Sequence, residues 1–114
     1  EGAYLIERPV NFDAETIRKK WKAETTAYMQ EWKEIINTLA DFSAANIEHA
    51  FKSFLEAKQL GIGAVLLPYR LAITGVGAGP GMFDVSSFLG KEEVLSRMEL
   101  GIKEIERIVN EAAN

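Results

Sequence analysis

The amino-acid sequence predicts an all-α protein. Apolar side chains recur every three or four residues through most of its 114 residues, and the strict alternation typical of half-buried β-strands is nearly absent. Helix-capping residues precede the apolar stretches, and glycines follow several of them. A chain of this length can form one helical domain, or a small domain joined to the end of its neighbour.

Two helices are predicted before residue 40. Asp13 is a good N-cap for a first helix that runs to Trp21, and Thr25 or Thr26 caps a second helix. The apolar face of the second helix consists of Met29, Trp32, Ile36 and Leu39.

A third helix is predicted to begin after Ser43 and to end at Gly61. Its apolar residues recur at positions i, i+4, i+7 and i+8, which is the spacing of one helix face. They are Ile47, Phe51, Phe54 and Leu55. We expect these side chains to form part of the core.

The segment from Ala64 to Ile73 is almost entirely apolar, so its pattern alone fits either a buried strand or a buried helix. Pro68 favours the helix. A proline in a central strand removes a donor from the sheet, whereas the first turn of a helix has no intrahelical partner for that donor. We therefore predict a helix from about Leu66 to Thr74, with Gly75 as its C-cap.

Residues Val76 to Gly81 contain three glycines and a proline, which predicts a loop. A short amphipathic helix from Met82 to Leu89 follows, and Gly90 ends it. The last helix begins near Lys91, and Gly101 weakens it without breaking it. Its apolar stripe consists of Val94, Leu95, Met98, Ile102, Ile105 and Val109.

One domain boundary is predicted, around Ala40 to Ser43. Residues 1–41 are interpreted as the last helices of an adjoining helical domain with its linker, and residues 42–114 as a compact cage of four helices. Because the chain begins with Glu1 and not with Met, we expect it to be a piece of a longer protein.

The charge balance argues against a general nucleic-acid binder, and no DNA partner is expected. The formal net charge is -4, and sequence-independent affinity for nucleic acids comes from Lys and Arg. Positive charge is nevertheless concentrated in Arg18-Lys-Lys-Trp-Lys22. This cluster is either a solvated helix face or the local positive charge of a module that binds nucleic acid as part of a larger body.

Composition also bears on the cellular location. No apolar run approaches the ~20 residues needed to span a bilayer, and the first ten residues do not have the pattern of a signal peptide. The absence of cysteine excludes disulfides and thiolate metal sites and fits a reducing compartment. We expect a soluble, cytoplasmic protein with no membrane partner.

The sequence contains no recognisable catalytic, cofactor-binding or metal site. His49 is the only histidine, and we expect it on the exposed side of its helix without a partner nucleophile. The carboxylates form helix-surface pairs such as Glu92 with Glu93, without the grouping of metal ligands. The run Gly75–Gly81 lacks the preceding strand and the Gly-Lys-Ser/Thr ending of a phosphate-binding loop. Recognition of a partner is therefore the expected function.

Three motifs occur in order between residues 68 and 92. They are Pro68-Tyr-Arg-Leu-Ala-Ile-Thr-Gly75, Gly79-Pro-Gly-Met-Phe83 and Leu89-Gly-Lys-Glu92. In this order and at this spacing they resemble the anticodon-binding end of bacterial-type glutamyl-tRNA synthetases. The resemblance covers Phe42 to Arg97 well and the preceding region more loosely, and it implies the same helical cage.

The resemblance also implies which residues contact the anticodon. In that family the arginine of the first motif, the proline of the second and the hydrophobic residue two places later contact anticodon bases, and these correspond to Arg70, Pro80 and Met82. Gly79 and Gly81 complete the expected contact loop, because glycine lets the main chain approach a base closely. Gly79 replaces a threonine of some relatives, so any hydroxyl contact is lost there. From pattern alone, Arg70 could equally cap helix-end carbonyls.

Three further residues have open roles at this stage. Tyr69 replaces a commoner aliphatic residue, and its ring could pack in the core or stack on a base. Lys91 and Arg97 are candidate phosphate contacts, with exposed solubilising charge as the alternative.

The family implied uses ATP and Mg²⁺ to join glutamate to tRNA(Glu) during translation. The His-x-Gly-His motif and the Lys-rich ATP loop of class I synthetases are absent from these 114 residues. We therefore expect a non-catalytic piece that binds the anticodon loop of tRNA(Glu) and works with the remainder of the synthetase chain. A rival hypothesis keeps the fold but makes it a protein-interaction module that binds another polypeptide through the exposed parts of Trp21, Trp32 and Met82.

Overall fold

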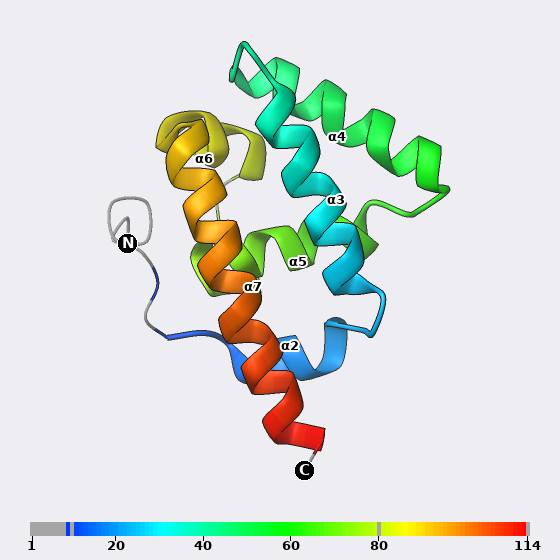
Figure 1. Cartoon of the computed structure of the whole chain (residues 1–114), viewed down its shortest axis with the longest axis vertical. Coiled ribbons are helices and arrows are strands. Elements are labelled where there is room, and N and C mark those ends of the chain that lie inside the picture. The colour runs from blue at the N-terminus through cyan, green and yellow to red at the C-terminus, as the bar shows by residue number, and fades with distance from the viewer. Residues whose placement is uncertain (1–8, 10, 80, 114) are drawn as a thin grey trace.

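The computed structural model describes residue 9, residues 11–79 and residues 81–113. These residues form six α-helices and no β-strand, which confirms the predicted all-α class (Figure 1). The helices are α2 (Ala14–Lys20), α3 (Thr25–Thr38), α4 (Ala44–Lys58), α5 (Gly63–Thr74), α6 (Met82–Leu89) and α7 (Lys91–Ala113). In this part of the chain no helix is both long and apolar enough to cross a membrane.

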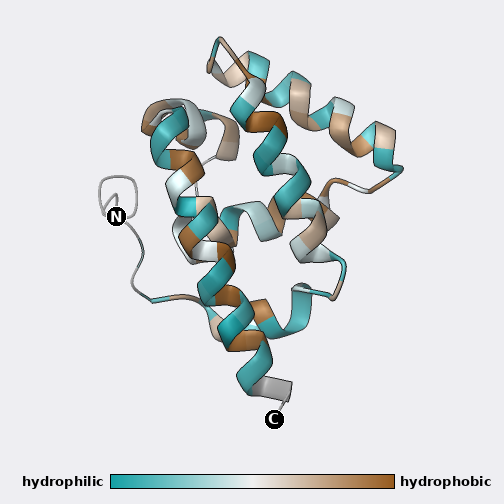
Figure 2. Ribbon diagram, in the orientation of Figure 1, coloured by the Kyte–Doolittle hydropathy of each residue, from teal (hydrophilic) through white to brown (hydrophobic). Residues whose placement is uncertain are grey.

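Helix α7 organises the packing of the other helices. It runs the length of the molecule in Figure 1 and packs against α5, α3, α2 and α6, while α4 packs against α6 and α3. Bands of hydrophobic and hydrophilic residues alternate along α7 (Figure 2), as expected for a helix with one buried face. The fully buried members of its predicted stripe are Val94, Met98, Ile102 and Ile105.

A single hydrophobic core joins the helices on both sides of the predicted domain boundary. It includes Ile17 and Trp32 before the boundary, and Tyr69 and Ile102 after it. Helices α2 and α3 both pack against α5 and α7. The division into residues 1–41 and 42–114 stays a prediction, and among the described residues the two parts are packed together.

The indole of Trp32 lies at the centre of an aromatic cluster that joins α3, α4 and α5. Its ring centroid is 5.0 Å from that of Phe51, 6.1 Å from that of Phe54 and 5.7 Å from that of Tyr69. The contacts with Phe51 and Tyr69 are edge-to-face, which sets a positive ring edge against a negative face. Burial confirms the core predicted for α4, which consists of Ile47, Phe51, Phe54 and Leu55.

Side chains cap two helices as predicted. Asp13 accepts a hydrogen bond from the N–H of Thr16 at 3.2 Å before α2, and Ser43 accepts one from the N–H of Asn46 at 3.2 Å before α4. The hydrogen bonds from Thr16 lower the pKa of Asp13. Both caps satisfy N–H groups that have no partner within their own helix.

The predicted end of α4 and the predicted cap of α3 were wrong. Helix α4 ends at Lys58, before Gly61, because Gln59 adopts the left-handed conformation there with φ 59°. Thr25 is the first residue of α3 and not its cap, and Glu24 occupies the cap position without a side-chain hydrogen bond.

Helix α5 begins at Gly63, three residues earlier than predicted, so Pro68 lies inside the helix and not in its first turn. Proline has no N–H to donate to the carbonyl of Ala64 four residues earlier. The side chains of α5 that enter the core hold the helix despite this missing bond, and Pro68 itself is buried. The predicted end is confirmed, because Gly75 is the C-cap with φ 82°.

Phe88, a large aromatic residue of α6, lies outside the core. Helix α6 buries Met82, Val85 and Ser86, which share one face at positions i, i+3 and i+4. Phe88 follows Met82 by six residues and falls on the other side of the helix, so 68% of it is exposed.

Helices α5 and α7 approach so closely that position 101 requires glycine. A Cβ atom on Gly101 would lie 2.4 Å from the carbonyl oxygen of Ala72 and 3.1 Å from its Cα. Gly101 has a low helix propensity and weakens α7, but its missing side chain permits the close contact between α7 and α5.

We predict that Gly101→Ala lowers the free energy of unfolding. Alanine improves helix propensity by up to about 1 kcal/mol, but overpacking against a backbone oxygen costs about 1–3 kcal/mol, and a contact of 2.4 Å places it toward the upper end of that range. Urea denaturation followed by circular dichroism measures the difference. Gly63→Ala is the matched control, because a Cβ there meets nothing within 4 Å, and it should be neutral or stabilising. Equal stability of the two variants would contradict the close contact.

Candidate nucleic-acid interface

The α5–α6 loop comprises residues 75–81, and its first three residues rest on the N-terminal end of α2. The N–H of Asp13 donates to the carbonyl oxygen of Gly75 at 2.8 Å. A Cβ on Gly75 would lie 2.7 Å from a backbone oxygen of the segment before α2, and one on Gly77 would lie 3.5 Å from the methyl carbon of Thr16. The first half of the loop is therefore held against α2 at glycine positions.

Thr74, the last residue of α5, ties the start of the loop to the helix. It is buried, and its hydroxyl donates to the carbonyl oxygen of Arg70 at 2.8 Å. The same hydroxyl oxygen accepts from the N–H of Val76 at 3.3 Å. The turn of α5 that carries Arg70 is thus joined directly to the loop.

A chain of two side-chain hydrogen bonds fixes the other end of the loop. Ser86 donates its hydroxyl hydrogen to the carbonyl oxygen of Met82 at 2.7 Å, and its oxygen lies 2.5 Å from the hydroxyl of Tyr69. Because a serine hydroxyl has one hydrogen, Tyr69 is the donor in the second bond. Burial raises the pKa of Tyr69, so the phenol keeps that hydrogen. The ring packs in the core, and α5 thereby holds the first turn of α6.

The sequence pattern gave no role in the site to the hydroxyl groups of Thr74 and Ser86. Of the two alternatives left open for Tyr69, the structure shows the packed ring, and the hydrogen bond from its hydroxyl to Ser86 was not predicted. A signal was present, since hydroxyl side chains occur on both sides of the glycine-rich loop. Their pairing depends on how α5 and α6 cross, which the sequence pattern does not contain.

Arg70 lies half-buried on the outward face of α5. Leu66 and Leu67, four and three residues earlier, share this face and are also half-buried. A guanidinium beside apolar side chains at the edge of a loop can pair with a base edge or stack on a base. The base contact assigned to Arg70 stays a prediction.

The end of the loop presents main-chain groups. Gly79 and Gly81 are exposed, and Gly79 has φ 150°, which L side chains rarely adopt. Gly81 precedes α6 without a side-chain cap, so the positive end of the helix and its first N–H groups point toward the loop. Met82 is only 2% exposed as a whole residue, and the base contact assigned to it stays a prediction. Pro80 lies outside the described residues.

The two candidate phosphate contacts differ in position. Arg97 is 1% exposed, and it donates to the carboxylate of Glu93 at 2.8 Å and to the carbonyl of Ile73 at 3.2 Å. This burial corrects the prediction for Arg97, whose guanidinium supports the end of α5 inside the fold. Lys91 is half-buried and donates to the carbonyl of Leu39 at 2.9 Å. Its phosphate contact stays a prediction.

The surface suggested for the rival protein-interaction module does not exist in this fold. Trp21, Trp32 and Met82 are 6%, 0% and 2% exposed, and all three belong to the core. The rival hypothesis was wrong in assigning them to a docking face.

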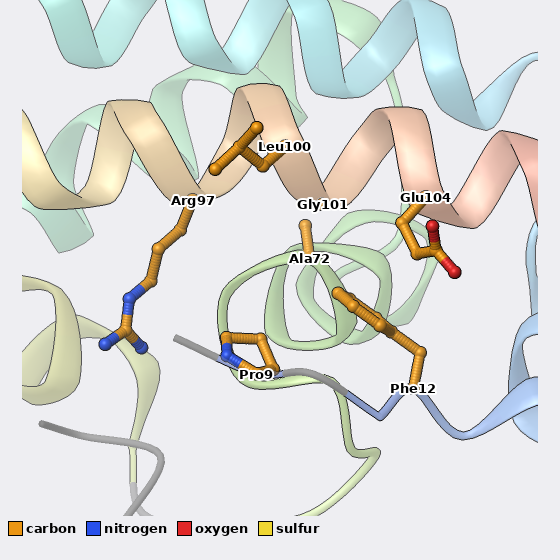
Figure 3. Close-up of a pocket in the computed structure, with 7 residues that line it drawn as sticks. All are labelled: Pro9, Phe12, Ala72, Arg97, Leu100, Gly101 and Glu104. Carbon is orange, nitrogen blue, oxygen red and sulfur yellow. The ribbon is translucent and has the colours of Figure 1, made fainter. Parts of the chain in front are cut away.

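A cavity of about 390 Å³ lies between α7 and the segment before α2 (Figure 3). Its lining residues are Pro9, Phe12, Ala72, Arg97, Leu100, Gly101 and Glu104. Glu104 is bonded to Arg107, which lowers the pKa of its carboxyl group, and Figure 3 shows Arg97 extending away from Glu104. None of the predicted base-contact residues lines this cavity. His49 is exposed elsewhere, and no cluster suited to a metal ion occurs among the described residues.

Known proteins match the chain across most of its length. A family model described as an anticodon binding domain matches residues 1–102. The glutamate–tRNA ligase of Flavobacterium johnsoniae is 37% identical over 99 residues, which are 87% of this chain and 20% of that protein. The ligase of Pelodictyon phaeoclathratiforme is 38% identical over 104 residues, which are 91% and 21%.

Solved structures agree with this match. A glutamate tRNA ligase from Elizabethkingia meningosepticum, crystallised in complex with its amino acid, has a TM-score of 0.86 and 38% identity over 91% of this chain and 20% of its own. The chain spans about one fifth of the length of these relatives. With its all-α fold and its glycine-rich loop between α5 and α6, the chain belongs to the anticodon binding domain family.

Proposed function

We propose that this chain is the anticodon-binding part of a glutamate–tRNA ligase, and that Arg70 and the α5–α6 loop read bases of the tRNA(Glu) anticodon. One observation carries the proposal. An exposed glycine-rich loop is held at both ends by buried hydroxyl groups, those of Thr74 and Ser86, next to the helix turn that carries Arg70.

This arrangement suits single-stranded RNA. Proteins read the unstacked bases of RNA loops through hydrogen bonds to base edges and through stacking. Arg70 supplies a planar donor group, and Gly79 and Gly81 allow a base to approach the main chain. The positive end of α6 lies beside the loop and favours a base carbonyl or a phosphate there. A loop already fixed before binding loses less conformational entropy when the RNA arrives.

Phosphate contact and catalysis involve other groups. The ammonium of Lys91 has three N–H donors, and one binds the carbonyl of Leu39, so a phosphate can use another. ATP and Mg²⁺ take part in the chemical step elsewhere in the parent enzyme. The parent enzyme works in the cytoplasm. In this proposal the chain contributes recognition to the remainder of the synthetase and no catalytic group.

In the whole synthetase, Arg70→Ala should weaken recognition of the cognate tRNA by about 1–3 kcal/mol, the usual contribution of a good base contact. Discrimination between the cognate tRNA and one with a substituted anticodon should fall with it. Pro80→Ala should act in the same direction but less, because it loosens the loop without deleting a donor. Equilibrium binding to both tRNAs measures these effects.

Arg107→Ala is the control for Arg70→Ala. Arg107 is an exposed arginine of α7 paired with Glu104 and Glu111, and its loss should leave discrimination unchanged. If Arg70→Ala in a folded enzyme also leaves discrimination unchanged, the base-reading role is wrong and Arg70 is a helix-capping residue.

Tyr69→Phe tests whether the hydroxyl chain positions the loop. The change removes the donor to Ser86, which still donates to Met82. We expect the free energy of unfolding to fall by about 1 kcal/mol and discrimination between anticodons to fall severalfold, because α6 is no longer held to α5 at this point.

Tyr28→Phe removes the same atom from a half-buried tyrosine of α3 and should change neither quantity appreciably. Thermal unfolding and paired tRNA titrations measure both variants. A Tyr69→Phe protein that loses stability but keeps full discrimination would show that the hydroxyl chain stabilises the fold alone.

A further inference from the structure

The basic segment Arg18–Lys22 carries positive charge that the proposed reading loop does not use. Four of the 13 Lys and Arg residues fall within these five positions, in a chain of net charge -4. They are Arg18, Lys19, Lys20 and Lys22, and all four are exposed. A local concentration of this kind is where an acidic protein can meet a polyanion.

Helix α2 connects this segment to the α5–α6 loop. The loop packs on Thr16 at Gly77 and is bonded to Asp13 at Gly75. At a rise of about 1.5 Å per residue, Lys20 lies roughly 6 Å beyond Thr16 along the helix axis. The basic turn is therefore the exposed part of α2 directly beyond the loop's point of attachment.

Helix geometry distinguishes the cations from one another. Successive residues are rotated by about 100°, so Lys20 lies within roughly 40° of Thr16 around α2, whereas Arg18 lies roughly 160° away on the other side. Lys19 is paired with Glu15 at 3.3 Å, and among the described residues Lys20 makes no ion pair. Lys20 is thus the cation nearest to Thr16 on the loop side of the helix that makes no ion pair among the described residues.

We propose that Lys20 binds a phosphate of the tRNA strand next to the anticodon bases. This inference rests on the proposed function, because it extends the surface from Arg70 across α5 to the last turn of α2. Leu67 lies on that path, since a Cβ on Gly77 would be 3.6 Å from its Cδ1 atom. An ammonium on a flexible stem binds phosphate as a point charge and reads no base.

The competing explanation is electrostatic support of α2 alone. Arg18, Lys19 and Lys20 all lie in its last turn, where cations interact favourably with the negative end of the helix dipole. If that were the only role, removing the charge of Arg18 or of Lys20 would have the same effect on tRNA binding. A phosphate contact predicts an effect for Lys20 alone.

The test compares Lys20→Gln with Arg18→Gln in the whole synthetase that contains this chain. Each change removes one positive charge from the same exposed turn, so the effect on the helix dipole is matched. Lys20→Arg keeps the charge and serves as the rescue variant. The dissociation constant for cognate tRNA is measured over roughly 50 to 200 mM salt.

Lys20→Gln should reduce the slope of log K against log salt concentration by about 0.7 to 1, and should raise the Kd roughly fivefold near 0.1 M salt. Arg18→Gln and Lys20→Arg should leave the slope unchanged. An unchanged slope for Lys20→Gln, or an equal change for Arg18→Gln, would overturn the inference.

The same titrations separate this inference from the proposed function. A phosphate contact does not depend on the base sequence. Lys20→Gln should therefore weaken the binding of cognate and anticodon-substituted tRNAs by the same factor. Loss of discrimination in Lys20→Gln would contradict the phosphate contact. If Arg70→Ala does not change discrimination, base reading by Arg70 is contradicted. The phosphate contact of Lys20 is tested separately, by the salt slope of Lys20→Gln.

Discussion

Helix α5 lies so close to α7 that a backbone oxygen of α5 occupies the space that a side chain at position 101 of α7 would need. The carbonyl oxygen of Ala72 would be 2.4 Å from a Cβ on Gly101. Arg97 of α7 strengthens this contact by donating to the main chain of α5 at 3.2 Å. The outward face of α5 carries Arg70, and its last residue, Thr74, begins the loop. The positions of Arg70 and of the start of the loop therefore depend on this contact.

The α5–α6 loop is held from three directions. The segment before α2 bonds to Gly75, the hydroxyl of Thr74 bonds to Val76, and Tyr69 holds the first turn of α6 through Ser86. Between these anchors the loop contains glycines whose main-chain groups are open to a base. A loop that is already fixed loses little conformational entropy when it binds, and its small residues let a base approach the main chain closely. The planar guanidinium of Arg70 on the adjacent helix restricts the orientation of a bound base.

Local physics made much of the fold predictable from sequence. Periodicity gave the all-α class, and capping chemistry located the helix start at Asp13 and the helix end at Gly75. Tertiary contacts decided the rest. The hydroxyl partner of Tyr69 is 17 residues away, and Arg97 is buried because its donors meet a carbonyl on another helix. The charge and hydropathy of a residue carry no information on such pairings. The base contact predicted for Arg70 came from the family resemblance of its motif.

The most direct measurement of the central claim is an NMR titration of the isotope-labelled chain with an anticodon stem-loop of tRNA(Glu). If the α5–α6 loop reads the anticodon, amide signals of residues 76–79 and 81–83 should shift together with the side-chain signals of Arg70. A stem-loop with a substituted anticodon should shift them less, and amides on the outer face of α4, such as that of Lys52, should not move with either RNA. Unchanged loop signals, or identical shifts with both RNAs, would contradict the account.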